Sequence, residues 1–197
     1  YMVFDALERG DLKLDQTLTA SRRAAGQAPS RLGLKRGDRI TVRDAILALV
    51  TKSANDVATT VAEALGGKEI TFAKQMTEKA RELGMTNTTF RNASGLPNRR
   101  QKSTARDMAR LAVALQRNFP QYYKYFSERS FAWHDRTYEN HNKLLTAYNG
   151  TDGVKTGYTR ASGFNLVAST QRNGTRLIGV VFGGKTATSR NRHMIHI

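Results

Sequence analysis

Two short polar segments carry the side chains with which this chain could do chemistry. The first is Ser53-Ala54-Asn55 in the stretch LVTKSANDVAT, and the second is Lys155-Thr156-Gly157 in DGVKTGYT. A hydroxyl can pass a proton, an amide can hold a carbonyl group, and an ammonium beside a hydroxyl can bind a carboxylate. Taken singly, each segment also has a simpler interpretation. Ser53 or Asn55 would cap a helix at a corner, and Lys155 would begin a strand after a turn at Gly153.

The first segment interrupts a helical pattern. Apolar residues at helical spacing predict helices over residues 1–9, 41–51, 55–65, 68–83 and 104–117, so that Ser53 falls at the corner between two of them. Thr104 and Asp107 have the spacing of a helix cap, and we interpret Asp107 as a helix-start carboxylate. The Gly- and Pro-containing stretch from Ala20 to Asp38 predicts a long surface excursion.

The second segment lies among strand-like patterns. From Ser130 onward the stretches SFAWHDRTYEN, DGVKTGYT, FNLVAST and TRLIGVVFGG alternate as strands do, and Asn173-Gly174 between the last two predicts a tight hairpin. We expect these segments to form an antiparallel sheet, closed by a short helix from about Ser189. Helices followed by strands and one last helix predict an α+β fold, with an antiparallel β-sheet packed with helices.

Composition narrows the classes of function. The 197 residues contain no cysteine, which excludes a disulfide framework, a thiolate metal site and a cysteine nucleophile. Lys and Arg number 32 against 16 Asp and Glu, a formal charge of +16 that favours polyanionic surroundings. The basic residues are scattered and have no aromatic platform, so we expect no nucleic-acid partner. His193 and His196 are three residues apart but have no third ligand in range, so we expect no metal.

The two polar segments are far more specific together than apart. Ser-x-Asn and Lys-Thr-Gly are two of the three signatures of penicillin-binding proteins and serine β-lactamases, and the third is S-x-x-K. The chain resembles the D-alanyl-D-alanine carboxypeptidases of the low-molecular-mass penicillin-binding group, serine peptidases that trim peptidoglycan stem peptides. The resemblance runs through nearly the whole chain, in the blocks LGLKRGDRITVRDAILALVTKSANDVATTVAEAL, GMTNTTFRNASGLP, STARDMARLA, DGVKTGYTRASGFNLVAST and GVVFGGKTATSR.

The resemblance implies a fold and a domain organisation. The fold would be that of the serine β-lactamases and DD-peptidases, which is also described as penicillin-binding transpeptidase-like. Residues 1–197 would form a single catalytic domain, with a helical part over about 1–127 and a sheet part over about 128–197. No cofactor is implied.

The resemblance also assigns catalytic roles. Ser53 would pass a proton between the motif lysine and the leaving amine, and Asn55 would hold the substrate amide carbonyl and orient that lysine. Lys155 would supply fixed positive charge, which keeps a neighbouring lysine neutral enough to act as a base and attracts the terminal carboxylate of the substrate.

Four further residues would bind substrate. Thr156 would hydrogen-bond the carboxylate, and Gly157 would leave room for the peptide to lie along the strand. The backbone N–H of Tyr158 would donate to the oxyanion, and Arg190 would assist carboxylate recognition, although it could instead be a solvated helix residue. His141 falls where some relatives carry an arginine near the cleft, and we leave it outside the catalytic set.

One departure from the family pattern is large. No S-x-x-K occurs in these residues, and in the family its serine would lie about eight residues upstream of Tyr1. We therefore expect a chain that is incomplete at its N-terminus, lacking the nucleophile and the first strands of the sheet and inactive as it stands. A second domain and a C-terminal anchor, through which a peripheral association with the inner membrane would run, would also be missing.

The expected partners are the peptidoglycan stem peptide and β-lactam antibiotics, and the expected location is the bacterial periplasm or cell envelope, with a signal peptide outside this chain. A β-lactamase would need a carboxylate to activate the deacylating water, and no such Glu-x-x-x-Asn segment lies between the two motifs. Endopeptidase activity on the same fold stays an open alternative, because it differs from carboxypeptidase activity in the shape of the cleft. The alternative from another class is a non-catalytic protein on the same fold that binds wall peptide or polyanion.

Overall fold

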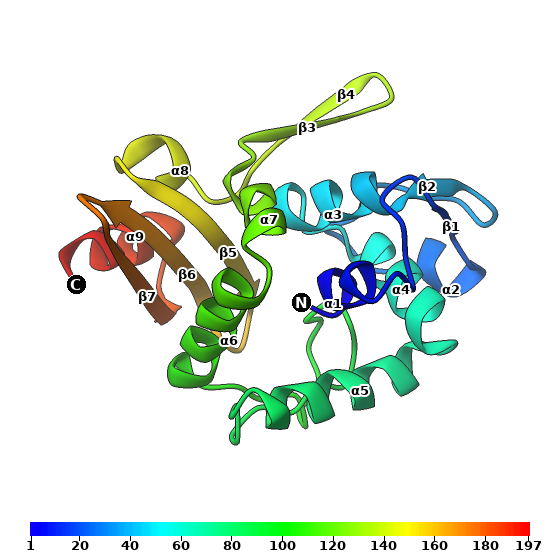
Figure 1. The fold of residues 1–197 in the computed structure, drawn as a ribbon, viewed down its shortest axis with the longest axis horizontal. Helices are drawn as coiled ribbons and strands as arrows, with labels where there is room; N and C mark the ends of the chain where they lie inside the picture. The colour runs from blue at the N-terminus through cyan, green and yellow to red at the C-terminus, as the bar shows by residue number, and fades with distance from the viewer.

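The computed structural model describes all of residues 1–197 (Figure 1). In chain order the elements are α1 (Met2–Glu8), β1 (Thr17–Thr19), α2 (Arg22–Ala25), β2 (Arg39–Thr41), α3 (Val42–Thr51), α4 (Asn55–Gly66), α5 (Glu69–Glu82), α6 (Ala105–Asn118), α7 (Pro120–Tyr123), the 3₁₀ helix η1 (Lys124–Ser127), β3 (Ser130–Trp133), β4 (Arg136–Glu139), α8 (Leu144–Ala147), β5 (Thr151–Thr159), β6 (Gly163–Arg172), β7 (Thr175–Gly184) and α9 (Ala187–His196). The five predicted helices are all present, and the predicted α+β class is confirmed. None of the helices combines the length and the hydropathy that crossing a membrane requires.

The main sheet has three antiparallel strands in the order β5-β6-β7. Asn173 and Gly174 join β6 to β7 with φ angles of 48° and 78°, which is the left-handed geometry that a two-residue hairpin of Asn-Gly adopts. Because β6 occupies the central position, β5 pairs on one side only. The strand that carries Lys155-Thr156-Gly157 therefore keeps a free edge.

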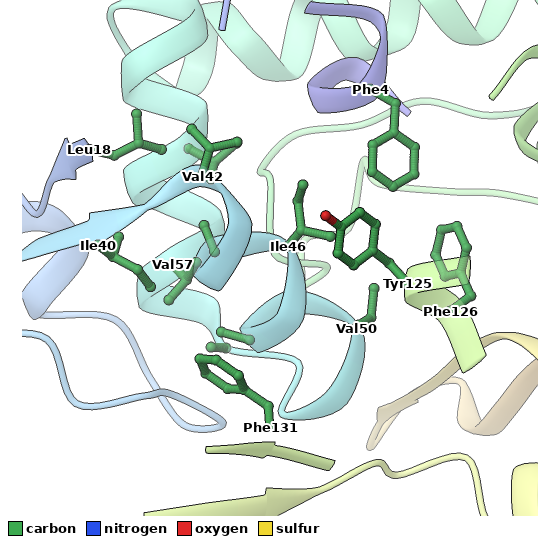
Figure 2. Packing of buried hydrophobic residues seen from close by; sticks show 14 of the residues in the cluster. Phe4, Leu18, Ile40, Val42, Ile46, Val50, Val57, Tyr125, Phe126 and Phe131 are labelled. Carbon is green, nitrogen blue, oxygen red and sulfur yellow. The ribbon is translucent and has the colours of Figure 1, made fainter. Parts of the chain in front are cut away.

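The two faces of this sheet bury different neighbours. Side chains alternate between the faces of a strand, so Val167 of β6 joins the large helical core while Leu166 and Ala168 pack with Met194 of α9. Figure 2 shows the helical core, where side chains from α1, α3, α4 and η1 interlock, including Phe4, Ile46, Val57 and Tyr125. This core holds the end of α3 against the sheet.

The stretch SFAWHDRTYEN does not join the main sheet, contrary to our expectation. Its two halves form β3 and β4, which pair only with each other, Ser130 opposite Glu139 and Trp133 opposite Arg136. In Figure 1 this hairpin projects away from β5. The cause is the packing of β3, whose Phe131 is buried in the helical core and not on the sheet.

The stretch from Ala20 to Asp38 is not simply a surface excursion. Ala20, Ala24, Leu32 and Leu34 are buried, and the strands on either side pair, β1 with β2. The fully buried carboxylate of Asp56 accepts the backbone N–H groups of Leu32 at 2.9 Å, Gly33 at 2.7 Å and Leu34 at 3.0 Å. The polar residues that interrupt the helical pattern thus anchor this stretch to the start of α4.

Candidate active site

The corner between α3 and α4 is tightly constrained. Ser53 has a φ of 57°, a left-handed conformation that few residues other than glycine adopt and that is often found at functional sites. The N-cap of α4 is Ala54, and no side chain caps the helix, so the simple capping interpretation of Ser53 and Asn55 is wrong. The corner is instead bound to the preceding stretch, because the Ser30 hydroxyl donates to the Lys52 carbonyl at 2.9 Å.

Asn55 is fixed by two hydrogen bonds to that same stretch. Its backbone N–H donates to the Ser30 carbonyl at 2.8 Å, and its side-chain Nδ2 donates to the Ala28 carbonyl at 2.8 Å. The side-chain oxygen is therefore the end of the amide that stays available as an acceptor. The hydroxyl of Ser53 makes no hydrogen bond within the chain and is half-buried, so it too stays available.

Lys155 lies near the middle of β5, paired with Val167 of β6. Its side chain is half-buried, and Nζ donates to the carbonyl of Thr156 at 3.0 Å. Burial, together with the positive charge of Arg190, lowers the pKa of the Lys155 ammonium from 10.5 to about 8. At neutral pH the group is charged, yet it holds its proton less tightly than an exposed lysine.

One cleft brings these three residues together. Ser53, Asn55 and Lys155 line a cavity of about 220 Å³, with Leu49, Val50 and Phe126 among its apolar walls. The hydroxyl and the amide come from the helical corner, and the ammonium comes from the sheet edge. A hydroxyl, an acceptor oxygen and an ammonium converge on this apolar cleft. Together they can bind a carbonyl group and a carboxylate, and the hydroxyl can pass a proton.

The rest of the Lys-Thr-Gly segment continues along the free edge. Thr156 is half-buried, whereas Gly157 and Tyr158 are exposed, Tyr158 by 60 %. A Cβ added at Gly157 would meet only the Cβ of Asn165, at the ordinary distance of 3.9 Å. Nothing in the fold itself requires glycine here, so the open space beside this residue is available to a ligand.

Arg190 is buried, with 3 % of its surface exposed, and is not a solvated helix residue. It is held at the start of α9, where Nη1 donates to the Asn165 carbonyl at 2.9 Å and Nε donates to the Asn191 side chain at 3.0 Å. Burial lowers the pKa of its guanidinium, although an arginine remains charged at any physiological pH. Its positive charge contributes to the lowered pKa of Lys155.

The comparison with protein families decides the assignment. Residues 1–186 match the model of the peptidase S11 family, described as D-alanyl-D-alanine carboxypeptidase. This chain belongs to the D-alanyl-D-alanine carboxypeptidase family. Among curated members of the family, it is similar to the D-alanyl-D-alanine carboxypeptidase DacC of Escherichia coli strain K12, with 38 % identity over 193 residues that cover 94 % of this chain and 48 % of DacC.

Solved structures of the family share its fold. The crystal structure of the D-alanyl-D-alanine carboxypeptidase DacD from Francisella tularensis matches with a TM-score of 0.95 at 28 % identity, covering 100 % of this chain and 60 % of DacD. Penicillin-binding protein D2 of Listeria monocytogenes, solved in an ampicillin-bound form, matches with a TM-score of 0.86 at 32 % identity over 97 % of this chain and 78 % of its own. The predicted DD-peptidase fold is confirmed. The chain spans about half the length of the curated relatives that it matches.

Two features of this family member were not assigned from the sequence. Ala93 and Ser94, from the block GMTNTTFRNASGLP, line the same cleft as Ser53 and Lys155. His141 lies within electrostatic reach of the cleft, since burial and the charges of Lys155, Lys52 and Lys143 lower the pKa of its imidazole. The resemblance already located His141 near the cleft, and the structure adds that the positive charge of Lys155 acts on its imidazole.

Proposed function

We propose that this chain forms the substrate cleft of a serine-type D-Ala-D-Ala carboxypeptidase, which removes the terminal D-alanine from peptidoglycan stem pentapeptides through an acyl-enzyme. The observation that carries the proposal is the convergence of Ser53, Asn55 and Lys155 on one cleft in a chain of this family. The same cleft would accept β-lactam antibiotics, since the Listeria relative has been solved in ampicillin- and cefotaxime-bound forms.

Recognition would use the free edge of β5. A peptide that lies along this edge gains backbone hydrogen bonds, and Gly157 leaves the space for it. Lys155 and Thr156 would hold the terminal carboxylate, and the buried positive charge of Arg190 would strengthen the field there. The backbone N–H of Tyr158 would donate to the oxyanion.

Proton transfer would use the helical corner. Attack of a serine hydroxyl on the carbonyl of the penultimate D-alanine forms the ester and releases the terminal D-alanine, whose amine must gain a proton. Ser53 would pass that proton, and the Asn55 amide oxygen would accept a hydrogen bond from the lysine of an S-x-x-K motif. Alternatively, the second N–H of Asn55 Nδ2 would donate to the substrate carbonyl. No residue of this chain stands in an S-x-x-K motif, so we assign binding and proton relay, and not attack, to the residues present.

We place the protein in the bacterial periplasm or cell envelope, where its substrate is found. The charge of +16 supports association with acidic wall polymers. Peripheral association with the inner membrane belongs to the same proposal.

Stereochemistry provides the direct test of the cleft. We expect the chain to bind a peptide ending in D-Ala-D-Ala more tightly than the same peptide ending in L-Ala-L-Ala, by titration calorimetry, and Lys155→Ala to remove that binding. The charge-matched control is Lys35→Ala, because Lys35 is exposed and lies outside the cleft. Equal binding of the two peptides, or unchanged binding by Lys155→Ala, would contradict the proposal.

The second candidate is a binding protein on the same fold that takes up wall peptide or polyanion without turnover, and the formal charge of +16 favours it. The two functions differ in covalent chemistry. Protein purified from its native source is incubated with fluorescent penicillin and run on a denaturing gel. A covalent band supports the peptidase, whereas no band from protein that contains an S-x-x-K favours the binder.

A further inference from the structure

A second pocket adjoins the catalytic cleft. Ala93 and Ser94 line the cleft on one side and, on the other, a pocket of about 280 Å³. The polar walls of this pocket are Asn92, Gln101, Lys102 and Ser103. Because Ala93 and Ser94 line both cavities, a peptide whose end lies in the cleft can reach the second pocket across these two residues.

The walls of the second pocket are held rigidly. The side-chain oxygen of Gln101 accepts the backbone N–H groups of Arg91 at 2.8 Å and Asn92 at 3.2 Å. Asn92 in turn donates to the Leu96 carbonyl at 2.9 Å. The backbone N–H of Ala93 donates to the buried carboxylate of Glu69 at 3.2 Å. A site formed in advance loses little conformational entropy when it binds a ligand.

The same segment carries an unbalanced positive charge. Residues 91–102, RNASGLPNRRQK, contain Arg91, Arg99, Arg100 and Lys102 and no acidic residue. None of the four takes part in an ion pair of the structure, and Arg99, Arg100 and Lys102 are exposed. The carboxylate that anchors the segment, Glu69, is already paired with Arg23 at 2.7 Å. These cations are therefore free to bind an anion from outside the chain.

We propose that this pocket is a subsite for a carboxylate that precedes the D-alanyl-D-alanine end of the substrate, and that it makes the protein selective for acidic stem peptides. The inference rests on the proposed function, since it takes the peptide end to lie in the cleft. Lys102 lines the pocket, and the exposed Arg99 and Arg100 precede it in the same segment. Arginine and lysine in such numbers favour a carboxylate over the carboxamide of the same shape.

Two peptides test the subsite. Both are L-Ala-γ-D-Glu-L-Lys-D-Ala-D-Ala, one with the free α-carboxylate of the γ-linked glutamate and one with that group as the carboxamide. We expect this chain to bind the free acid about three- to tenfold more tightly at low ionic strength, because exposed ion pairs each add a small amount. The preference should shrink toward one in high salt, since salt screens exposed charges.

Two double variants locate the effect. Arg99→Ala with Arg100→Ala should reduce the preference, measured as the ratio of the affinities for the two peptides. Lys35→Ala with Arg36→Ala removes the same charge from an exposed turn outside both cavities, and this variant should keep the preference. Lys102→Ala should weaken binding of the free acid alone.

The possible outcomes distinguish the carboxylate subsite from the proposed D-Ala-D-Ala cleft on which it rests. Equal binding of the two peptides by the parent chain would overturn the subsite, while a retained preference for D-Ala-D-Ala over L-Ala-L-Ala would leave the proposed function standing. An equal loss of preference in both double variants would also overturn it, because a general field and not the segment would then be responsible. Failure to bind either peptide would overturn both proposals.

Discussion

Lys155 combines two requirements that oppose each other. Its ammonium must be charged to hold a carboxylate, but its partial burial and the nearby charge of Arg190 lower its pKa to about 8. Because the folded pKa is below that of an unfolded lysine, the charged form costs folding free energy at neutral pH. The same residue is therefore expected to support binding and to oppose stability.

A substitution at Lys155 separates these effects. Lys155→Met should abolish D-Ala-D-Ala peptide binding while leaving the free energy of unfolding at pH 7 unchanged or higher. The parent loses its burial cost as the pH rises through about 8, so the difference in stability should narrow between there and the pKa of an unfolded lysine, about 10.4. Urea denaturation at pH 7 and pH 10 measures this, and strong destabilisation at pH 7 would contradict it.

The pH dependence of binding has the opposite sign in the parent. Lys155 is protonated below about 8 and neutral above it, so affinity for the peptide carboxylate should fall as the pH rises through that value. Calorimetric titrations from pH 6.5 to 9.5 would show the fall. An affinity that stays constant over this range would argue that Lys155 does not hold the carboxylate.

Gly157 offers a cleaner separation of binding from folding. Gly157→Ala should change the free energy of unfolding by no more than about 1 kcal/mol, because its Cβ meets no close atom. It should weaken peptide binding about tenfold, since the methyl group enters the space beside the strand edge. Gly66→Ala is the contrasting control. Its Cβ would lie 2.7 Å from the Cβ and 2.9 Å from the backbone Cα of Phe72, so it should destabilise the fold.

At the scale of the elements, Asp56 links the helical corner to the stretch before it. Its carboxylate accepts three backbone N–H groups from residues 32–34 and is fully buried. Asp56→Asn presents donors to donors and should destabilise the protein by about 3 kcal/mol, with a parallel loss of peptide binding. Asp135→Asn, at an exposed hairpin position, should cost less than about 0.5 kcal/mol. Equal stability of the two variants in urea would show that Asp56 is not an anchor.

The elements themselves were largely predictable, and their long-range contacts were not. Helical spacing located α3 and α4, and Asn173-Gly174 located the β6–β7 hairpin, because these signals are local. The burial of Leu32 and Leu34 depends on Asp56, more than 20 residues away along the chain. The position of β3 likewise depends on where Phe131 packs, which no period in the sequence encodes.

For the candidate site, the resemblance predicted both the residues and their position in one groove, but not the local backbone geometry. The motifs predicted Ser53, Asn55 and Lys155 as site residues, and the structure places all three in one cleft. The left-handed backbone of Ser53 was hidden, since serine gives no local signal for it. The resemblance located His141 near the cleft, but the contact that holds it there comes from the fold: the side chain of Asn142, the next residue, donates to the Gly153 carbonyl at 3.1 Å and holds this loop beside β5.

At the scale of the whole molecule, we expect these residues to bind peptide without forming a covalent adduct with penicillin. The chain has the cleft lined by Ser53, Asn55 and Lys155 but no S-x-x-K. Intact mass spectrometry after incubation of these 197 residues with penicillin should therefore show an unchanged mass. An adduct of one penicillin would mean that another hydroxyl, with Ser53 the first to examine, acts as nucleophile.

The unpaired edge of β5 has a consequence for inhibition. An edge strand recognises its ligand largely through peptide N–H and C=O groups, which every amino acid except proline supplies alike. Point mutations can change the side chains around such an edge but leave its row of main-chain groups in place. We therefore expect few mutations to weaken a compound that imitates an extended peptide at this edge without also weakening the binding of a peptide substrate.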